Sequence, residues 1–335
     1  MARITAILRA LGRALRRDQK TLQSVVGNNF FIVSVLLLQE AGTFIYLIVG
    51  LVLLFPLSTD PLRKIPKSRL ELWPLDTHER HLLRALSPWV NPMTWALAAL
   101  AIWAARGRVT LGLWGLAAGV VAAGFLLSEL PGGPAHGLLR RVPNFPGPLN
   151  QLVRKNLREI VSTLDFYCGA LLTVSAIAWR LAGQLIPPEA LMALTILVVL
   201  AFSSYAQCLF GLDGGGGLSR YRLMPLRGWQ ILAAKDAAFL LVVIPLTLPL
   251  APLAGAGAAL VSLAVGHEAS VNQFRPQVRW RFSSGAGLFY GLFQAAMMAI
   301  AAAGIFYNGP FVLAGCAVIW LLSLRWYGHV LDRVG

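Results

Sequence analysis

Acidic residues are scarce in this sequence, and charge of either sign is sparse. The 335 residues include 14 Asp and Glu against 29 Lys and Arg, and 13% are charged whereas 57% are hydrophobic. Mean hydropathy is +0.67. A water-soluble fold cannot bury so large an apolar fraction, and no segment is long and polar enough to fold apart from the apolar runs. The composition excludes a soluble protein and predicts a single membrane domain.

Motifs for catalysis and cofactor binding are lacking as well. No Gly-x-x-x-x-Gly-Lys-[Ser/Thr] sequence occurs, so ATP binding through a P-loop is excluded, and the glycines at 214–217 have no lysine of a phosphate cradle beside them. His78 and His81 stand beside Arg80 and Arg84, which favours a mixed-charge docking face over a zinc site. No carboxylate pair, Ser/His pair or Cys/His pair converges at one membrane depth. We therefore expect no enzyme activity, no metal and no cofactor in this chain.

Long apolar runs make up most of the sequence. They cover residues 29–58, 89–105, 109–128, 164–183, 187–211, 236–267, 286–306 and 310–327. A spanning helix needs about 20 residues. The run at 236–267 is therefore predicted to hold two short helices, with Pro245, Pro249 and Pro252 as break points.

The basic residues predict how the runs are oriented. The net charge of +15 comes from clusters between the runs, at 3–20, 63–84, 140–158, 220–235, 275–281 and 325–333. Lys and Arg concentrate on the cytoplasmic side of membranes, so all six clusters are expected on that side. The chain must then cross the membrane an even number of times between each cluster and the next. This predicts about ten spans in the cell (inner) membrane with both termini cytoplasmic. Because these residues do not form one polar face, nucleic-acid binding is not expected.

The run at 29–58 leaves two interpretations open. It is either a hairpin of two short helices with Glu40 at the outer tip, or one tilted span with Glu40 near the middle of the membrane. A charge at the bilayer centre costs about 2.5–3.5 kcal/mol, which favours the hairpin. In the single span, Glu40 would be a functional candidate.

Two basic segments are predicted to form amphipathic helices at the membrane surface. In the first, Ile4, Ile7, Leu8 and Leu11 share one helix face opposite the arginines, and residues 149–161 show the same pattern. The chain then divides into an interfacial helix (1–27), a first transmembrane half (28–128), a cytoplasmic linker with the second amphipathic helix (129–162) and a second transmembrane half (163–335).

A short sequence recurs in the two halves. Residues 69–75 read Arg-Leu-Glu-Leu-Trp-Pro-Leu and residues 220–226 read Arg-Tyr-Arg-Leu-Met-Pro-Leu, and a basic residue follows at the same offset, Arg84 and Lys235. Each copy comes after an amphipathic segment and an apolar hairpin. The pattern favours two parallel half-repeats of four and six spans over chance similarity of two loops.

The proline in each copy predicts the start of a short cytoplasmic helix, at residues 75–86 and 226–237. A stiff helix between two spans can transmit a push from a motor subunit outside the membrane. The candidate site residues are Arg69, Leu72, Trp73, Pro74, Leu75, Arg80 and Arg84 in the first copy and Arg220, Leu223, Pro225, Leu226 and Lys235 in the second.

Several of these segments resemble the permease subunits of ATP-binding-cassette (ABC) exporters of the second type, or ABC-2 permeases. The resemblance rests on Phe210-Gly211-Leu212-Asp213-Gly214, Arg220 through Leu226, Lys235, and Ser270-Val271-Asn272 with Pro276. It implies that the loop helices at 74–86 and 225–237 dock on separate subunits that bind ATP. It leaves open whether one chain, a homodimer or a pair with a second permease subunit forms the pathway.

Four polar or aromatic residues within the apolar runs are assigned ordinary structural roles. Asp165 and Asp236 are predicted to begin spans, where the helix dipole favours an acid. His267 stands isolated in the sequence, and Trp320 fits an interfacial aromatic belt.

The sequence thus favours an all-α membrane protein that acts as the permease of an ABC export system, with its partners being an ATP-binding subunit and the lipid bilayer. ATP hydrolysis by the partner would drive substrate movement. The alternative is a stand-alone membrane enzyme or lipid-handling protein, which Glu40 and Arg180 would suit. The apolar lining gives no indication of the substrate.

Overall fold

The structure, a computed structural model, describes the following parts of the chain: residues 2–17, 62, 65, 70–90, 95, 149–181, 183, 185–213, 220–221, 223–277, 285 and 287–334. Every regular element in these parts is helical, as the sequence predicts. Several predictions concern residues outside them: the runs at 29–58 and 109–128 with Glu40, most of the run at 89–105, Arg69, and the glycines at 214–217. The chain divides into two compact units, which are described separately below.

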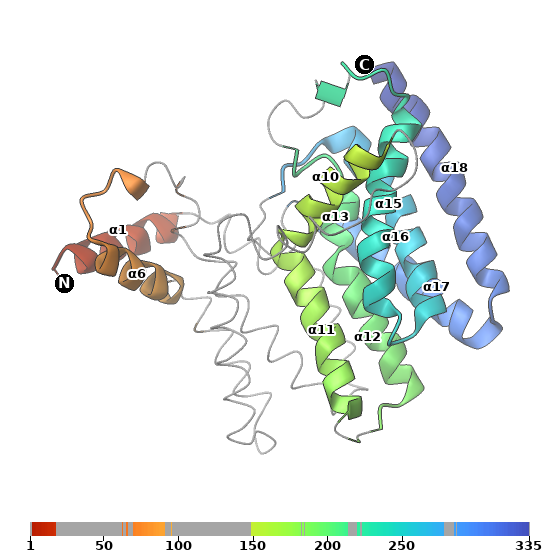
Figure 1. Cartoon of the computed structure of the whole chain (residues 1–335), viewed down its shortest axis with the longest axis horizontal. Coiled ribbons are helices and arrows are strands. Elements are labelled where there is room, and N and C mark those ends of the chain that lie inside the picture. The colour runs from red at the N-terminus through yellow and green to blue at the C-terminus, as the bar shows by residue number, and fades with distance from the viewer. Residues whose placement is uncertain are drawn as a thin grey trace. The chain divides into compact units, whose positions relative to one another are not determined.

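Within the described residues, three elements of the first unit have defined bounds. Helix α1 comprises Ala2–Arg17, α6 comprises Thr77–Leu86, and η2 comprises Ser87–Val90. Figure 1 shows α1 and α6 beside each other, and the two helices are in contact.

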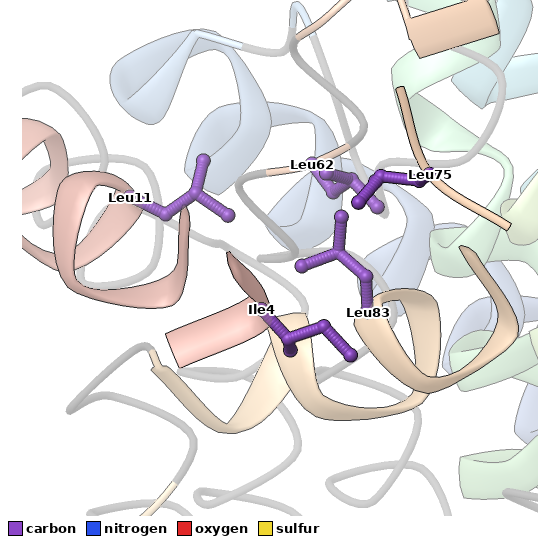
Figure 2. Close-up of a cluster of buried hydrophobic side chains, with 5 residues drawn as sticks. All are labelled: Ile4, Leu11, Leu62, Leu75 and Leu83. Atoms are coloured by element: carbon purple, nitrogen blue, oxygen red, sulfur yellow. The ribbon is translucent and has the colours of Figure 1, made fainter. Parts of the chain in front are cut away.

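The amphipathic helix α1 buries its apolar face against protein. Ile4 and Leu11 of α1 form a buried cluster with Leu62, Leu75 and Leu83, and Figure 2 shows these five side chains gathered between the two helices. The arginines of the opposite face that the structure describes are exposed, namely Arg3, Arg9 and Arg13. A helix is therefore confirmed over Ala2–Arg17, whereas residues 18–27 of the predicted segment lie outside the described residues and its position at the membrane surface stays a prediction. The buried leucines that contact Ile4 and Leu11 come from α6 and the segment before it.

Leu83 lies at the centre of this cluster and is 2% exposed. We expect Leu83→Ala to destabilise the contact between α1 and α6 by about 2–5 kcal/mol, because the substitution leaves a cavity among side chains that cannot close it fully. Limited proteolysis of the full chain in detergent would detect this as faster cleavage within residues 2–17. The matched control is Leu86→Ala on the exposed side of α6, for which cleavage should be unchanged.

The second unit is a bundle of packed helices (Figure 1). Its elements are α10 (Asn150–Val161), α11 (Leu164–Leu181), α12 (Pro188–Ala201), α13 (Ser203–Gln207), α15 (Gly228–Thr247), α16 (Pro252–Gln273), α17 (Leu288–Asn308) and α18 (Phe311–Val334). Helix α16 is central and packs against α12, α13, α15, α17 and α18. The amphipathic helix α10, predicted to lie in the linker, packs against α15 and so belongs to this unit.

The long apolar run at 236–267 is divided between two helices, as predicted. Helix α15 ends at Thr247 and α16 begins at Pro252. Proline suits the first turn of a helix, because the N–H group that it lacks would have no partner within the helix there. The connecting backbone is held by Arg180, which donates to the Pro249 carbonyl at 2.7 Å, and by Thr195, which accepts from the Ala251 N–H at 3.2 Å. The helices have 20 and 22 residues, so they are longer than expected, and Pro245, one of the three predicted break points, lies inside α15.

Within the described residues, three helices are long and apolar enough to cross a membrane: α15, α17 and α18. A fourth is added if α10 and α11, which bend by 74° where they meet, form one broken span. Helix α12 is apolar but has only 14 residues. The chain therefore has the helices of a membrane-embedded protein, and the predicted total of ten spans is not confirmed.

Candidate functional site

The loop before α6 makes two successive tight turns. The Trp73 N–H donates to the Leu70 carbonyl at 3.2 Å, and the Leu75 N–H donates to the Trp73 carbonyl at 2.7 Å. The second bond spans only Pro74, as in an inverse γ-turn, for which the fixed φ of proline is suitable. The chain then enters α6, where the Asp76 N–H donates to the Glu79 side chain at 3.3 Å. Such a bond caps a helix start.

The loop before α15 repeats this arrangement 151 residues later, so that Tyr221 corresponds to Leu70. The Met224 N–H donates to the Tyr221 carbonyl at 3.1 Å, and the Leu226 N–H donates to the Met224 carbonyl at 2.8 Å across Pro225. The Arg227 N–H donates to the Gln230 side chain at 2.9 Å at the start of α15. The two loops therefore share the same backbone bonds at the same spacing.

Each loop exposes a leucine at the same position. Leu72 is 82% exposed and Leu223, 151 residues later, is 87% exposed. The prolines that follow two residues later, Pro74 and Pro225, are exposed as well. An exposed leucine is ordinary when it stands singly. Here the same apolar side chain projects from two loops of matching backbone structure, and this matched pair is the candidate site.

In the first unit, arginines hold the loop from behind. Arg80 donates through Nε to the Leu75 carbonyl at 3.1 Å and through Nη2 to the Glu71 carbonyl at 3.4 Å, and Arg3 of α1 donates to the Pro74 carbonyl at 3.5 Å. These bonds give hydrogen-bond donors to loop carbonyl groups that are not paired within a helix. The amphipathic helix and α6 thereby position the loop together.

In the second unit, a buried ion pair lies behind the loop. Lys235 of α15 is fully buried and its Nζ lies 2.8 Å from Asp213 Oδ2, with an Asp213 side chain that is 1% exposed. Lys235 also donates to Asn156 Oδ1 of α10 at 3.2 Å. A buried ammonium group is tolerated only when it is paired in this way. The bonds of Lys235 therefore join α10, α15 and the segment that follows α13.

Two further side chains complete the network around Asp213. Tyr221, in the loop itself, donates to Asp213 Oδ1 at 2.8 Å, and Lys155 of α10 forms a short ion pair with the same oxygen. Lys155 is 43% exposed and also lies 3.7 Å from Glu159 on its own helix. Two lysines are thus balanced by two acids.

The electrostatics of Asp213 follow from this geometry. Burial raises the pKa of its carboxyl group, but the Lys235 and Lys155 ammonium groups outweigh burial and hold that pKa below its usual value. Burial, together with the neighbouring Asp213 charge, raises the pKa of the Tyr221 hydroxyl. Asp213 is therefore ionised and Tyr221 neutral at neutral pH, which is the pattern the hydrogen bonds require.

The first unit has an apolar side chain where the second has this acid. The position of Asp213 corresponds to Leu62, 151 residues earlier, which lies in the buried leucine cluster, and Lys235 corresponds to the half-buried Arg84. One loop is therefore supported by apolar packing and arginine hydrogen bonds, and the other by a buried ionic network.

The structure places the predicted site residues in three groups. Leu72, Pro74, Arg220, Leu223 and Pro225 are exposed; Trp73, Arg80, Arg84 and Leu226 are half-buried; Leu75 and Lys235 are buried. Arg69 lies outside the described residues. Lys235 is thus a support of the loop rather than part of its outer surface.

Sequence reasoning left out Asp213, Tyr221, Lys155 and Asn156 as site residues. Asp213 and Tyr221 lay within segments noted for their resemblance, but nothing in the sequence paired them with Lys235. The predicted short helix at 226–237 is wrong, since α15 begins at Gly228 and continues without a break to Thr247. No glycine or proline follows Gly228 before Pro245, so no signal ends the helix near residue 237.

The roles predicted for Asp236 and His267 also need correction. Asp236 is the ninth residue of α15 and is fully buried, so it does not begin the helix. His267 of α16 is not isolated, because its Nε2 lies 3.0 Å from Asp236 Oδ2. Trp320 of α18 donates to the same carboxylate at 2.8 Å. Asp165 does lie in the first turn of α11, where it accepts a short hydrogen bond from Ser204.

Comparison of the chain with protein-family models, with curated protein sequences and with solved structures found no significant match in any of the three.

Proposed function

We propose that this chain is the permease subunit of an ABC export system, in which ATP hydrolysis by a separate subunit drives movement of a substrate across the membrane. The observation that carries the proposal is the matched pair of loops, Leu70–Glu79 and Tyr221–Gln230, with equal backbone bonds and an exposed leucine in each. The sequence resemblance to ABC-2 permeases adds the expectation that these loops contact the motor.

Two loops of the same structure can bind a partner that has two identical binding surfaces. Leu72 and Leu223 are anchors of the kind that fill a pocket on a binding partner, and the turns on either side hold each leucine in place before binding. A partner made of two identical ATP-binding subunits would provide one such pocket for each loop. The duplicated loops therefore favour an ATPase dimer over a partner with one binding surface.

The second loop is also well connected to a membrane-crossing helix. Only Arg227 separates Leu226 from the first residue of α15, and α15 runs from there as one helix of 20 residues. Asp332 of α18 accepts from the Gly228 N–H at the start of α15. The buried Asp213–Lys235 pair ties the preceding segment to the same helix. A push on the loop would therefore be passed on to α15 and α18.

The same proposal includes the finer architecture. Two parallel half-repeats of four and six spans would place both loops, and both termini, on the cytoplasmic side of the inner membrane. ATP would bind to the partner and no cofactor to this chain. A single chain, a homodimer or a pair with a second permease subunit could line the pathway.

The double variant Leu72→Asp with Leu223→Asp tests the proposal. The full chain is purified from its native membranes, and Mg²⁺-dependent ATP hydrolysis in the eluate is measured. We expect the ATPase activity of the eluate to be at least tenfold lower than with wild type, because a charge in each apolar contact weakens binding of the partner at both loops. The matched control is Leu185→Asp, since Leu185 is 96% exposed but lies outside both loops.

Two results would contradict the proposal. One is a wild-type eluate without ATPase activity under mild extraction, which would favour the stand-alone enzyme or lipid-handling protein. The other is labelling of single cysteines at positions 72 and 223 by an impermeant reagent added only from outside the cell. Cytoplasmic loops should be labelled only after the membrane is opened.

A further inference from the structure

A second polar cluster lies inside the bundle, between α15, α16 and α18. Asp236 of α15 and His267 of α16 are both 0% exposed, and His267 Nε2 is 3.2 Å from Asp236 Oδ1 and 3.0 Å from Oδ2. On the other side of the ring, His267 Nδ1 is 2.9 Å from Ser323 Oγ of α18. The loops of the candidate site do not use this cluster.

The hydroxyl group of Ser323 decides which ring nitrogen carries a proton. Ser323 donates its only hydrogen to the Ala264 carbonyl at 2.8 Å, and a carbonyl oxygen can only accept. The hydroxyl is then an acceptor toward the ring, so His267 Nδ1 must be the donor. In a neutral imidazole with a proton on Nδ1, the other nitrogen carries a lone pair.

That lone pair would face the carboxylate of Asp236, and the two would repel each other at 3.0 Å without water between them. The Trp320 indole N–H at 2.8 Å satisfies only one site on Oδ2. A proton between Nε2 and the carboxyl group turns the repulsion into a hydrogen bond. It resides either on His267, giving an imidazolium beside a carboxylate, or on Asp236, giving a carboxylic acid beside a neutral ring.

We propose that Asp236 and His267 form a buried proton-binding site, and that the bound proton holds α15, α16 and α18 together. The pair with its proton is neutral overall, which is the state that a buried site favours. Through Trp320 and Ser323, both of α18, the same proton connects the helix at the edge of the bundle to its centre. No part of this inference depends on the proposed function.

Other titratable groups face the pair from the surrounding helices. Tyr327 of α18 has its ring centroid 6.3 Å from that of His267, and Tyr205 of α13 lies within electrostatic range of Asp236. Lys235 precedes Asp236 but is bound to Asp213. Glu268 follows His267, is exposed, and accepts from Tyr290 of α17. The cation nearest in sequence is therefore already paired with Asp213.

Asp236→Asn supplies the test, because the asparagine amide offers a donor and an acceptor in place of those of a protonated carboxyl group but does not ionise. Its NH₂ group can donate to His267 Nε2 while its oxygen accepts from Trp320. The apparent Tm of the full chain in detergent is measured at pH 7 for wild type, Asp236→Asn, Asp236→Ala and the control Glu268→Gln. We expect Asp236→Asn and Glu268→Gln to melt close to wild type and Asp236→Ala to melt markedly lower, because alanine replaces neither hydrogen bond.

A second measurement keeps the proposal testable if Asp236→Asn does not fold. Nitrogen NMR of the chain with labelled histidine, with His267 assigned by its absence in His267→Gln, reports whether both ring nitrogens are protonated at pH 7. Infrared spectra report a protonated carboxyl group. Either an imidazolium signal for His267 or a carboxylic acid that Asp236→Asn or Asp236→Ala removes would support the site. A neutral His267 with no such acid would overturn it.

Discussion

Asp213→Leu is expected to destabilise the second unit by about 3–5 kcal/mol, the cost of removing one partner of a buried ion pair. Lys235, fully buried, would lose the carboxylate that lies 2.8 Å from its Nζ. Tyr221 would lose its acceptor in the same step. The measurement is the unfolding of the full chain in detergent, followed by the near-ultraviolet signal of its aromatic residues.

The double variant Asp213→Leu with Lys235→Met distinguishes the lost charge pair from a simple packing defect. Replacing a buried pair by apolar residues of similar volume is often neutral or stabilising by about 1–4 kcal/mol. The first unit already has Leu62 at the position of Asp213. Lys155 can turn to solvent, since it is 43% exposed. A double variant as unstable as the single one would show that the charges do not account for the effect.

Gly266→Ala is expected to destabilise the bundle by about 3 kcal/mol, the upper end of what overpacking costs. A Cβ at this position of α16 would lie 2.3 Å from the Ala206 carbonyl oxygen. The obstacle is backbone and cannot rotate away. The same carbonyl accepts from Ser270 Oγ at 2.8 Å, which in turn accepts from the Leu209 N–H at 3.1 Å, so moving α16 breaks these bonds too.

Gly315→Ala is the control for this substitution. Gly315 lies within α18, and a Cβ there would meet no atom within 4 Å. Alanine is more favourable than glycine inside a helix by about 1 kcal/mol, so this variant should be neutral or more stable than wild type. Both are measured as changes in apparent Tm. Equal shifts in the same direction would refute the close contact between α16 and α13.

Local signals in the sequence were sufficient to locate most helices of the second unit. The proline at 252 and the length of the run at 236–267 predicted the break between α15 and α16, and the apolar runs predicted α11, α17 and α18. These signals depend on neighbouring residues only. The second short loop helix was predicted wrongly because Pro225 marks a helix start but no residue after it marks an end before Thr247.

Side-chain partners could not be inferred in the same way. A period of 3.6 residues shows which face of α1 is apolar but not whether lipid, α6 or another helix covers it. Asp213 and Lys235 are 22 residues apart, and Asp236 and His267 are 31 apart. Such pairs meet only because α10, α15, α16 and α18 cross at particular rotations, which sequence spacing does not specify.

Composition and the spacing of apolar and basic residues are enough to predict helices long and apolar enough to cross a membrane and two related loops. Both properties depend on the solvent around each segment and on bonds between near neighbours. Which charges are buried together, and that one loop rests on leucines and the other on an ion pair, depends on contacts between helices far apart in the chain. Those contacts exist only after the helices have packed, since a buried charge is stable only where folding brings it a partner.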